Sequence, residues 1–313
     1  MPRFCRHSVQ TIFGVAAAVS ALLLTACGGA ASSDDTSGTG EAYTVQQAMG
    51  ETSLPGTPDR IVVLDSPHLD ALVALGVTPV GATESGAGSG FPAYLSGSLD
   101  GTKSVGATAE PDLEAIAALV PDLIIGSKVR HEKIYDQLSA IAPTVFSVNS
   151  GTDWQEQAHI TAAAVNRNEE MNELLTGLSE RAVSIGRDVG ADGKTASMVR
   201  FRPNNFRLYG PNTFSGSILT QVGFNLGERD WNEYSMLELS PENYGQIDGE
   251  IVFYTNPGGD PNSTTMHTVT ALWGAQPGVQ NGSAFEVEDE TWMVGIGVVG
   301  ANIILDQISE ALA

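Results

Sequence analysis

Residues 60–76 read RIVVLDSPHLDALVALG, and they decide the fold class. Residues 61–64 form an unbroken apolar run, which is typical of a strand buried on both faces of a parallel sheet. Ser66 is the expected N-cap of the helix that follows, with Pro67 at its first position and Gly76 at its end. Between these ends the apolar residues recur with helical spacing. The stretch therefore predicts a buried strand that leads directly into a helix.

The same alternation of strand and helix recurs along the chain. Residues 113–120 have helical spacing and precede a second buried run at 123–125. In the second half, strands are expected at 195–201 and 251–254, and a closing helix at 298–312. Strands that alternate with helices in this way favour parallel sheets. The predicted fold is therefore α/β, with two Rossmann-like lobes that have mainly parallel sheets.

A long helix is expected between the two halves. Residues 153–188 contain no proline and only two glycines, and their apolar positions keep helical spacing. The sequence Asn-Arg-Asn at 166–168 is where that helix would be interrupted. We therefore expect an N-terminal α/β lobe at residues 44–150, one long backbone helix that joins the lobes at 151–190, and a C-terminal α/β lobe at 191–313.

The first 43 residues indicate export and a lipid anchor. Residues 1–26 carry two early arginines and an apolar stretch that is short for a membrane span, as in a secretory signal peptide. The segment ends in Leu-Thr-Ala-Cys27, which resembles a bacterial lipobox. This resemblance implies cleavage before Cys27 and lipidation of its thiol. Residues 27–43 then form a polar tether rich in glycine and serine. An ordinary signal peptide and an uncleaved anchor are the alternatives.

Composition excludes several classes of protein. The 313 residues include 15 Lys+Arg against 37 Asp+Glu, a net charge of -22, so a nucleic acid is not an expected partner. Two cysteines cannot form a disulfide scaffold. With 42% hydrophobic residues, the chain is too apolar to be disordered and long enough for two buried cores.

Several motifs in order resemble the iron–siderophore substrate-binding lipoproteins of ABC importers. They are RIVVLDSPHLDALVALGVTPVGAT, VGATAEPDLEAIAALVPDLIIGS, SMVRFRPNNFRLYGPNTFSGSILTQVGF and LSPENYGQIDGEIVFYT, with the long helix between the second and the third. The resemblance covers nearly all of residues 45–313. It implies two lobes that face each other across a shallow cleft, a ferric siderophore captured there, and ABC permease subunits that receive it. It also implies a monomer on the extracytoplasmic face of the cell membrane, held by its lipid only and needing no cofactor.

The carboxyl ends of parallel strands supply the candidate ligand contacts, because open α/β sheets bind ligands there. A ferric siderophore brings iron already coordinated by anionic oxygens, so the protein needs guanidinium donors and aromatic faces and no metal ligand of its own. Arg202 ranks first, with Arg130 and Tyr209 next. Pairing with acids is the alternative for each arginine, and core packing is the alternative for each aromatic. The full candidate set is Arg202, Arg130, Tyr209, Trp231, Tyr234, Tyr254, Trp273, His68 and Lys128.

Two glutamates are candidates for permease docking. The segments PDLEAIAALVPDLIIGS (111–127) and SPENYGQIDGEIVFYT (240–255) share one design, in which a glutamate early in a helix stands eight residues before an acid that precedes a buried strand. The family resemblance implies that one such glutamate on each lobe pairs with permease arginines. The matching positions are Glu114 and Glu242. Ordinary first-turn helix acids are the alternative for both.

Other functions stay open at this point. A binding protein for free zinc or manganese would use His68, His131 and His267, although none of these has a histidine or cysteine neighbour at ligand spacing. Haem and cobalamin are bound by relatives of the same architecture. The sequence contains no Gly-x-Ser-x-Gly, P-loop or His-Glu-x-x-His motif, so we do not expect an enzyme.

Overall fold

The computed structural model describes residues 40–84 and 90–313 of the chain. These residues belong to one compact unit that spans residues 37–313. The signal peptide expected at 1–26 and the lipidation site expected at Cys27 lie outside the described residues, as does most of the tether expected at 27–43. No helix in the described part of the chain is both long enough and apolar enough to cross a membrane.

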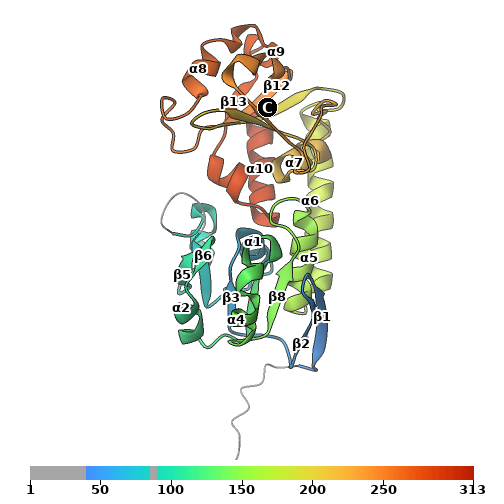
Figure 1. Cartoon of the computed structure of the whole chain (residues 1–313). Helices are drawn as coiled ribbons and strands as arrows, with labels where there is room; N and C mark the ends of the chain where they lie inside the picture. The colour runs from blue at the N-terminus through green and yellow to red at the C-terminus, as the bar shows by residue number, and fades with distance from the viewer. Residues whose placement is uncertain (1–39, 85–89) are drawn as a thin grey trace, which may run out of the picture. The chain divides into compact units, whose positions relative to one another are not determined.

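The first lobe is built on a six-stranded sheet with the strand order β6-β5-β4-β3-β7-β8 (Figure 1). Neighbouring strands are parallel, except that β5 and β6 are antiparallel. An antiparallel hairpin of β1 and β2 precedes this sheet. The strands are β1 (Tyr43–Gln47), β2 (Gly50–Leu54), β3 (Ile61–Val63), β4 (Gly81–Glu84), β5 (Lys103–Ala107), β6 (Glu110–Pro111), β7 (Leu123–Ser127) and β8 (Thr144–Ser147).

Alternate residues of β3 and its extension pack into two different cores. Ile61 and Val63 belong to a hydrophobic cluster that includes helix α1, whereas Val62 and Leu64 belong to a cluster with α2 and α4 on the other face. This division explains the unbroken apolar run, because both faces of the strand are covered. The helices of this lobe are α1 (Ser66–Ala74), η1 (Ala93–Ser98), α2 (Leu113–Ala118), α3 (Lys128–His131), η2 (Glu132–Ile134) and α4 (Tyr135–Ser139).

Helix α1 begins one residue earlier than the sequence suggests. Its N-cap is Asp65, whose carboxylate accepts a hydrogen bond from the Ser66 backbone N–H at 3.0 Å. The Ser66 hydroxyl instead donates to the backbone oxygen of Val294, 3.1 Å away and 228 positions later in the chain. Ser66 was expected as the cap because serine commonly fills that position. Here its side chain links two distant segments.

The second lobe is built on a five-stranded sheet with the order β11-β10-β9-β12-β13. Strands β9, β12 and β13 are parallel, whereas β10 is antiparallel to both β9 and β11. The tight turn after Arg202 produces the antiparallel β9–β10 pair, so this sheet is mixed where the first is almost wholly parallel. The strands are β9 (Ala196–Phe201), β10 (Phe206–Tyr209), β11 (Met236–Leu239), β12 (Ile251–Thr255) and β13 (Ala284–Glu286).

Helices cover both faces of this second sheet. Ile251 and Phe253 of β12 face the cluster that contains α7 and α10, whereas Val252 and Tyr254 face the cluster that contains α8. The helices are α7 (Phe214–Val222), η3 (Pro241–Gln246), α8 (Met266–Thr270), η4 (Trp273–Ala275), α9 (Pro277–Gln280) and α10 (Val298–Ala311). A π-helical turn, η5 (Glu290–Val294), precedes α10.

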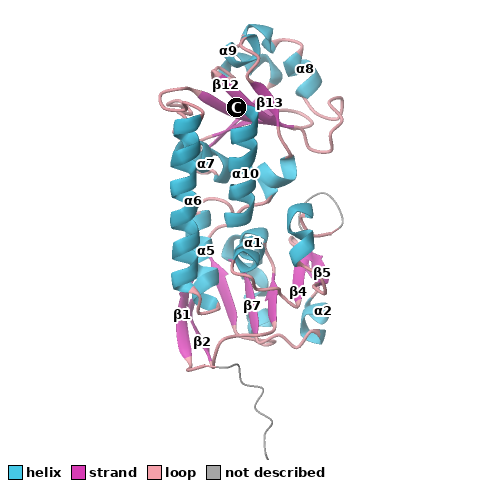
Figure 2. Ribbon diagram, turned by 180° about the vertical axis from the view of Figure 1, so that it is seen from behind, coloured by secondary structure: helices cyan, strands magenta, loops and turns pink. Residues whose placement is uncertain are grey.

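The expected long helix connects the sheets, and it is interrupted once, so that a shorter helix precedes a 21-residue one. These are α5 (Trp154–Ala164) and α6 (Asn168–Asp188), and the interruption falls where the sequence placed it. Asn166 has a φ of 56°, a left-handed conformation that ends α5, and asparagine adopts it more readily than most residues. Figure 2 shows α6 running beside α7 and α10.

A single hydrophobic cluster joins the two lobes. It extends from Val45 in the first hairpin to Ile308 in the last helix and includes residues of α1, α5, α6, α7 and α10. The backbones of α6 and α7 approach so closely at Gly186 that a Cβ there would overlap the carbonyl oxygen of Val222. Close packing of this kind fixes α6 against the second lobe.

Candidate ligand-binding site

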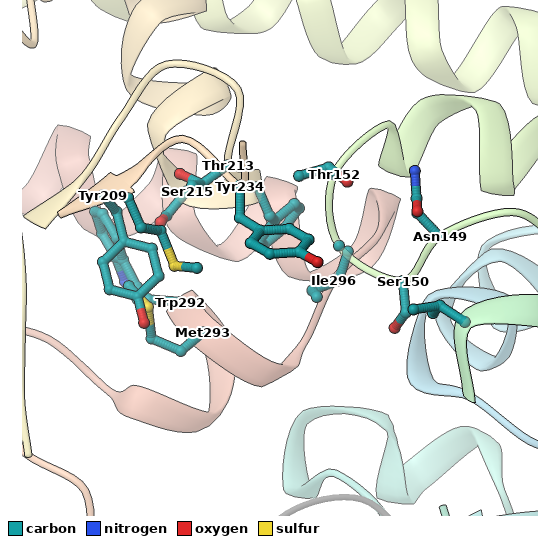
Figure 3. Close-up of a pocket in the computed structure, with 14 residues that line it drawn as sticks. Asn149, Ser150, Thr152, Tyr209, Thr213, Ser215, Tyr234, Trp292, Met293 and Ile296 are labelled. Atoms are coloured by element: carbon teal, nitrogen blue, oxygen red, sulfur yellow. The ribbon is translucent and has the colours of Figure 1, made fainter. Parts of the chain in front are cut away.

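A pocket lies between the two lobes and contains residues from both (Figure 3). The space between its walls, counted out to open solvent, is about 680 Å³. The lining residues are Val129, Asn149, Ser150, Gly151, Thr152, Tyr209, Thr213, Phe214, Ser215, Tyr234, Met236, Trp292, Met293 and Ile296. We call this the inter-lobe pocket.

The second lobe supplies most of the aromatic surface of the inter-lobe pocket. Tyr209, Trp292 and Met293 lie together on one side, and Tyr234 reaches across towards the first lobe (Figure 3). Tyr234 is half exposed, so a ligand can cover its ring. Trp292 is fixed from behind by stacking on Phe253, with ring centroids 5.0 Å apart. The buried Trp292 therefore supports the pocket from behind, and Tyr234 presents the most exposed aromatic ring.

None of the described residues that line the inter-lobe pocket is charged. Arg130 borders it, because its Nε lies 3.2 Å from the hydroxyl of the lining residue Ser150. The same nitrogen is 3.0 Å from Asp65 Oδ2, and the Ser127 hydroxyl donates to that oxygen at 2.6 Å. Asp65 is almost fully buried, whereas the Arg130 side chain is 46% exposed. Arg130 is therefore held by an acid but still accessible to a ligand.

A second arginine, Arg200, lies beside the pocket residue Tyr209. Arg200 of β9 donates through Nη2 to Asp289 Oδ2 at 2.6 Å, and the Thr255 hydroxyl donates to the other Asp289 oxygen at 2.8 Å. Burial alone would lower the pKa of the Arg200 guanidinium, but Asp289 and Tyr209 together raise it above its ordinary value. Arg200 therefore stays charged beside a pocket residue.

The highest-ranked candidate, Arg202, lies two positions further along. It follows the last residue of β9, and its backbone N–H donates to the Asn205 oxygen at 2.9 Å. Its side chain makes no hydrogen bond or ion pair to any residue that the structure describes. It does not line the inter-lobe pocket, so its contact with a ligand stays a prediction.

The other expected contacts divide into two groups. Tyr209 and Tyr234 line the inter-lobe pocket, and Lys128 lies near its border on α3, where its Nζ is 3.6 Å from Glu132 Oε1. Tyr254 and Trp273 pack against each other with ring centroids 5.3 Å apart, in the cluster on the other face of the second sheet. Trp231 joins that cluster, and the Arg229 guanidinium lies 5.9 Å from its ring. These three aromatics do not line the pocket.

His68 also lies away from the pocket surface. It is buried, and its two ring nitrogens are hydrogen-bonded to the hydroxyls of Thr161 and Ser147 at 2.8 and 3.1 Å. Burial lowers the pKa of His68 to about 4, although Asp65 opposes this shift. Both ring nitrogens are engaged in holding the interior of the first lobe together.

The free-metal alternative finds no support in the histidine geometry. Both nitrogens of His131 are also engaged, one with the Ser127 N–H and the other with the Thr108 oxygen. No group of three or more His, Cys, Asp or Glu side chains in residues 40–84 and 90–313 is arranged to hold a metal ion. His267 lies on α8, on the far side of the second sheet from His68 and His131.

Sequence reasoning missed the residues from the turn before α10. Trp292, Met293 and Ile296 belong to neither a strand nor a regular helix, so no periodic pattern identifies them. The available signal is composition: a Trp-Met pair at 292–293 stands one residue before the glycine-rich Gly-Ile-Gly at 295–297. Asn149 to Thr152 follow β8, and strand-end reasoning applies to them as it does to the candidates that were chosen.

Two α/β lobes with a pocket between them define a solute-binding protein of the two-lobe type. The model of the family described as "Periplasmic binding protein" matches residues 61–291, and the chain therefore belongs to that family. This confirms the family that the sequence motifs indicate.

Curated relatives from Bacillus subtilis match almost the whole chain. The probable siderophore-binding lipoprotein YfiY is 36% identical over 305 residues, which cover 93% of this chain and 94% of the relative. The Fe(3+)-citrate-binding protein YfmC is 31% identical over 287 residues, covering 88% of this chain and 90% of the relative. Among solved structures, Staphylococcus aureus SirA complexed with staphyloferrin B superposes with a TM-score of 0.75 at 30% identity, over 86% of this chain and 98% of that one.

Proposed function

We propose that this chain captures a ferric siderophore between its two lobes and delivers it to the permease of an ABC importer. The observation that carries the proposal is the inter-lobe pocket, in which rigid aromatic faces from one lobe meet polar loop residues from the other. The relatives named for siderophore and ferric citrate binding align with this chain over most of both lengths, and SirA, solved with staphyloferrin B, has the same fold. No catalytic step is part of this function.

The chemistry of the cargo fits these residues. The chelator coordinates the iron, so the protein needs no cofactor and no metal ligand of its own. Tyr234 and the edge of Tyr209 offer aromatic surface to the chelator backbone, with the buried Trp292 packed behind them. Arg130 and Arg202 supply guanidinium donors for its anionic oxygens, one from each lobe. We infer that Lys128, beside Arg130 on α3, adds positive charge at the border.

We further infer that the mature protein is a monomeric lipoprotein held by Cys27 on the extracytoplasmic face of the cell membrane. Diacylglycerol supplies two acyl chains, which is about what stable anchoring requires. Replacing Cys27→Ala should release the protein into the medium or leave a larger uncleaved precursor. Retention on the membrane at the mature size in that variant would contradict the assignment.

Permease docking is proposed for Glu114 and Glu242. Both are exposed and stand in the first turn of their helices, α2 and η3. The acid eight residues later has the same role in both lobes: Asp122 accepts from the Arg60 N–H at 2.8 Å, and Glu250 accepts from the Thr195 N–H at 3.0 Å. Each bond lies just before a pair of parallel strands. The two glutamates therefore occupy equivalent positions in two similar units.

A ligand panel tests the proposed function. The purified protein is titrated by calorimetry with ferric citrate and with ferric hydroxamate, catecholate and mixed citrate–hydroxamate siderophores. Haem, cobalamin, zinc and manganese are included because the sequence leaves them open. We expect at least one ferric siderophore to bind and its iron-free form to bind more weakly. Binding of haem, cobalamin or free metal with no response to any ferric chelate would overturn the proposal.

A further inference from the structure

A buried carboxylate of the first lobe caps a helix of the second. Asp70 lies in α1 and has no exposed surface. Its Oδ1 accepts the Val299 N–H at 2.8 Å and its Oδ2 accepts the Gly300 N–H at 3.0 Å. These amides belong to the first turn of α10, which has no side-chain cap of its own. Amides at this position have no partner within a helix, and their dipole favours an anion.

Three glycines make room for this contact. A Cβ at Gly297 would overlap the Asp70 carboxylate, and a Cβ at Gly295 would lie 2.6 Å from the ring of Tyr94. A Cβ at Gly300 would overlap the carbonyl oxygen of Gly295. The Tyr94 hydroxyl completes the arrangement by donating to Asp70 Oδ2 at 3.0 Å. Asp70 and Tyr94 therefore contact residues 295–300 from the side of the first lobe.

The segment that Asp70 and Tyr94 contact continues directly into the lining of the inter-lobe pocket. Trp292, Met293 and Ile296 line the pocket within eight residues of the capped amides, and we call residues 292–296 the wall segment. On its other side the wall segment is attached to the second lobe, since Trp292 stacks on Phe253 and its indole N–H donates to Gln307 at 2.6 Å. The wall segment is therefore held between the two lobes.

Two further bonds from the first lobe reach the same region. The Ser66 hydroxyl donates to the Val294 oxygen at 3.1 Å, and the Ala93 N–H donates to Glu290 Oε2 at 3.1 Å. The Ser66 bond joins two neutral groups, and the Ala93 bond is charge-assisted by Glu290 of the second lobe, so among these contacts Asp70 supplies the one charged group that belongs to the first lobe. Charge-assisted bonds are roughly twice as strong as neutral ones.

We propose that Asp70 is a positioning residue: its carboxylate holds the wall segment of the inter-lobe pocket from the opposite lobe, and protonation of that carboxylate loosens the wall. A carboxylate accepts at both oxygens. A carboxylic acid instead presents an O–H that faces one of the donors, so at least one of the three hydrogen bonds must break or turn. The wall segment then loses its link to α1.

The surroundings of Asp70 make this ionisation accessible. Burial raises the pKa of Asp70 to about 6, although the bonds from Gly300, Val299 and Tyr94 oppose the rise. Tyr94 of η1 is the titratable group bonded to it, and burial and Asp70 itself raise the pKa of that phenol well above its ordinary value. Glu290 of η5 faces Tyr94, and Arg181 of α6 is engaged with Asn302 of α10. Within the described residues, no cation pairs with Asp70.

The test follows the free protein by nuclear magnetic resonance between pH 5 and pH 7.5. The sample is the chain without its first 27 residues, which keeps the whole compact unit of residues 37–313. We expect the Val299 and Gly300 amide signals to titrate with a midpoint near the pKa of Asp70. The Trp292 indole signal, assigned with a Trp292→Phe variant, should shift with the same midpoint. A shared midpoint would show that the wall responds to the carboxylate.

Matched variants separate positioning from general stability. Asp70→Asn should abolish the titration at all three signals. Asp112→Asn is the control, because Asp112 also accepts two first-turn amides, those of its own helix α2, but is exposed and far in the chain from the wall segment. Tyr94→Phe keeps Asp70 and removes one donor to its charged form, so the midpoint should move to higher pH. Tyr94→Phe also carries the test if Asp70→Asn does not fold.

The expected change in ligand affinity rests on the proposed function, whereas the nuclear magnetic resonance titration of the free protein does not. For a ferric siderophore identified in the panel, affinity should be about fivefold lower at pH 5.5 than at pH 7.5, a typical size for coupling between sites, and constant in Asp70→Asn. A Trp292 signal that does not move across this range, or that moves equally in Asp70→Asn, would overturn the proposal. Failure of every siderophore to bind would instead overturn the proposed function alone.

Discussion

Arg130 Nε lies 3.0 Å from Asp65 Oδ2, so the arginine at the border of the inter-lobe pocket is already paired with the carboxylate that begins α1. Arg200 and Asp289 form a second such pair, next to the pocket residue Tyr209. Among the described residues, Arg202 is in no such pair. A chelate that binds Arg130 must compete with Asp65 for its guanidinium. A chelate that binds Arg202 displaces no described acid.

The first prediction concerns these arginines. Arg202→Ala should weaken binding of an anionic ferric siderophore by about tenfold to a hundredfold, as expected for the loss of a hydrogen bond to a charged group. Arg130→Ala should have a smaller effect, because Asp65 already competes for that guanidinium. Calorimetric titration measures both. Arg187→Ala, on the exposed face of α6, is the control and should bind normally. Wild-type affinity in Arg202→Ala would place the ligand elsewhere.

The second prediction assigns the fluorescence response. Trp292 lines the inter-lobe pocket, whereas Trp273 packs on the other face of the second sheet. Ligand should therefore quench wild-type tryptophan emission, and most of that quenching should disappear in Trp292→Phe. Trp273→Phe should keep it. Equal quenching in the two variants would argue that the ligand lies far from the wall segment.

The third prediction concerns stability and pH. The pKa of His68 is about 4 in the folded protein and about 6.5 in the unfolded chain, so the unfolded chain binds the proton first and stability falls as the pH drops below 6.5. This contribution is about 2 kcal/mol between pH 6.5 and pH 5. The raised pKa of Asp70 acts in the opposite direction below about pH 6, because there the folded state binds the proton first.

A variant isolates the histidine contribution from that of Asp70. Urea unfolding at pH 7.5 and pH 5 should show that His68→Gln loses about 2 kcal/mol less than the wild type on acidification. His159→Gln, at an exposed position on α5, should behave as the wild type does. An identical loss in wild type and His68→Gln would refute the buried, neutral histidine.

The fourth prediction tests the contact between α6 and α7. Gly186→Ala places a Cβ against the Val222 oxygen and should lower the free energy of unfolding by about 1–3 kcal/mol, as overpacking usually does. Gly177→Ala in the same helix meets nothing within 4 Å and should raise it by about 0.5–1 kcal/mol. Urea unfolding of the two variants measures the contrast. Stabilisation by both changes would mean that the helices are not in backbone contact at Gly186.

The fifth prediction concerns delivery. The double variant Glu114→Ala, Glu242→Ala should bind ferric siderophore normally, because both side chains are exposed and outside the pocket, yet fail to support siderophore uptake by cells. A control pair, Glu169→Ala with Glu173→Ala on α6, has the same change in charge and should keep uptake. Normal uptake with the docking pair replaced would leave these glutamates as ordinary first-turn acids.

The fold was largely predictable because its signals are local. The apolar run at 61–64 and the one at 251–254 are both strands covered on two faces, and a single alternation rule accounts for both. The break at Asn166 is also visible in the sequence. The antiparallel β9–β10 pair is harder to foresee, because it depends on one four-residue turn at 202–205.

The site was only partly predictable, because it is assembled from loops of both lobes. Tyr209 and Tyr234 are predicted contacts that line the pocket, but nothing in the sequence distinguishes them from Tyr254 and Trp273. Strand alternation says that Phe253 and Tyr254 face opposite ways; it does not say which face turns towards the first lobe. Trp292 lies in a π-helical turn whose shape depends on contacts with the distant Asp70 region, and periodicity carries no information on such a turn.

The hydrophobic cluster that runs from Val45 to Ile308 has a consequence for folding cooperativity. Side chains of α1 and α5 from the first lobe share it with those of α7 and α10 from the second, and α6 packs between them. A chain cut between residues 190 and 191 would leave each half with a large apolar face that only the other half covers. The lobes are therefore one unfolding unit, and heat should melt them together in a single transition.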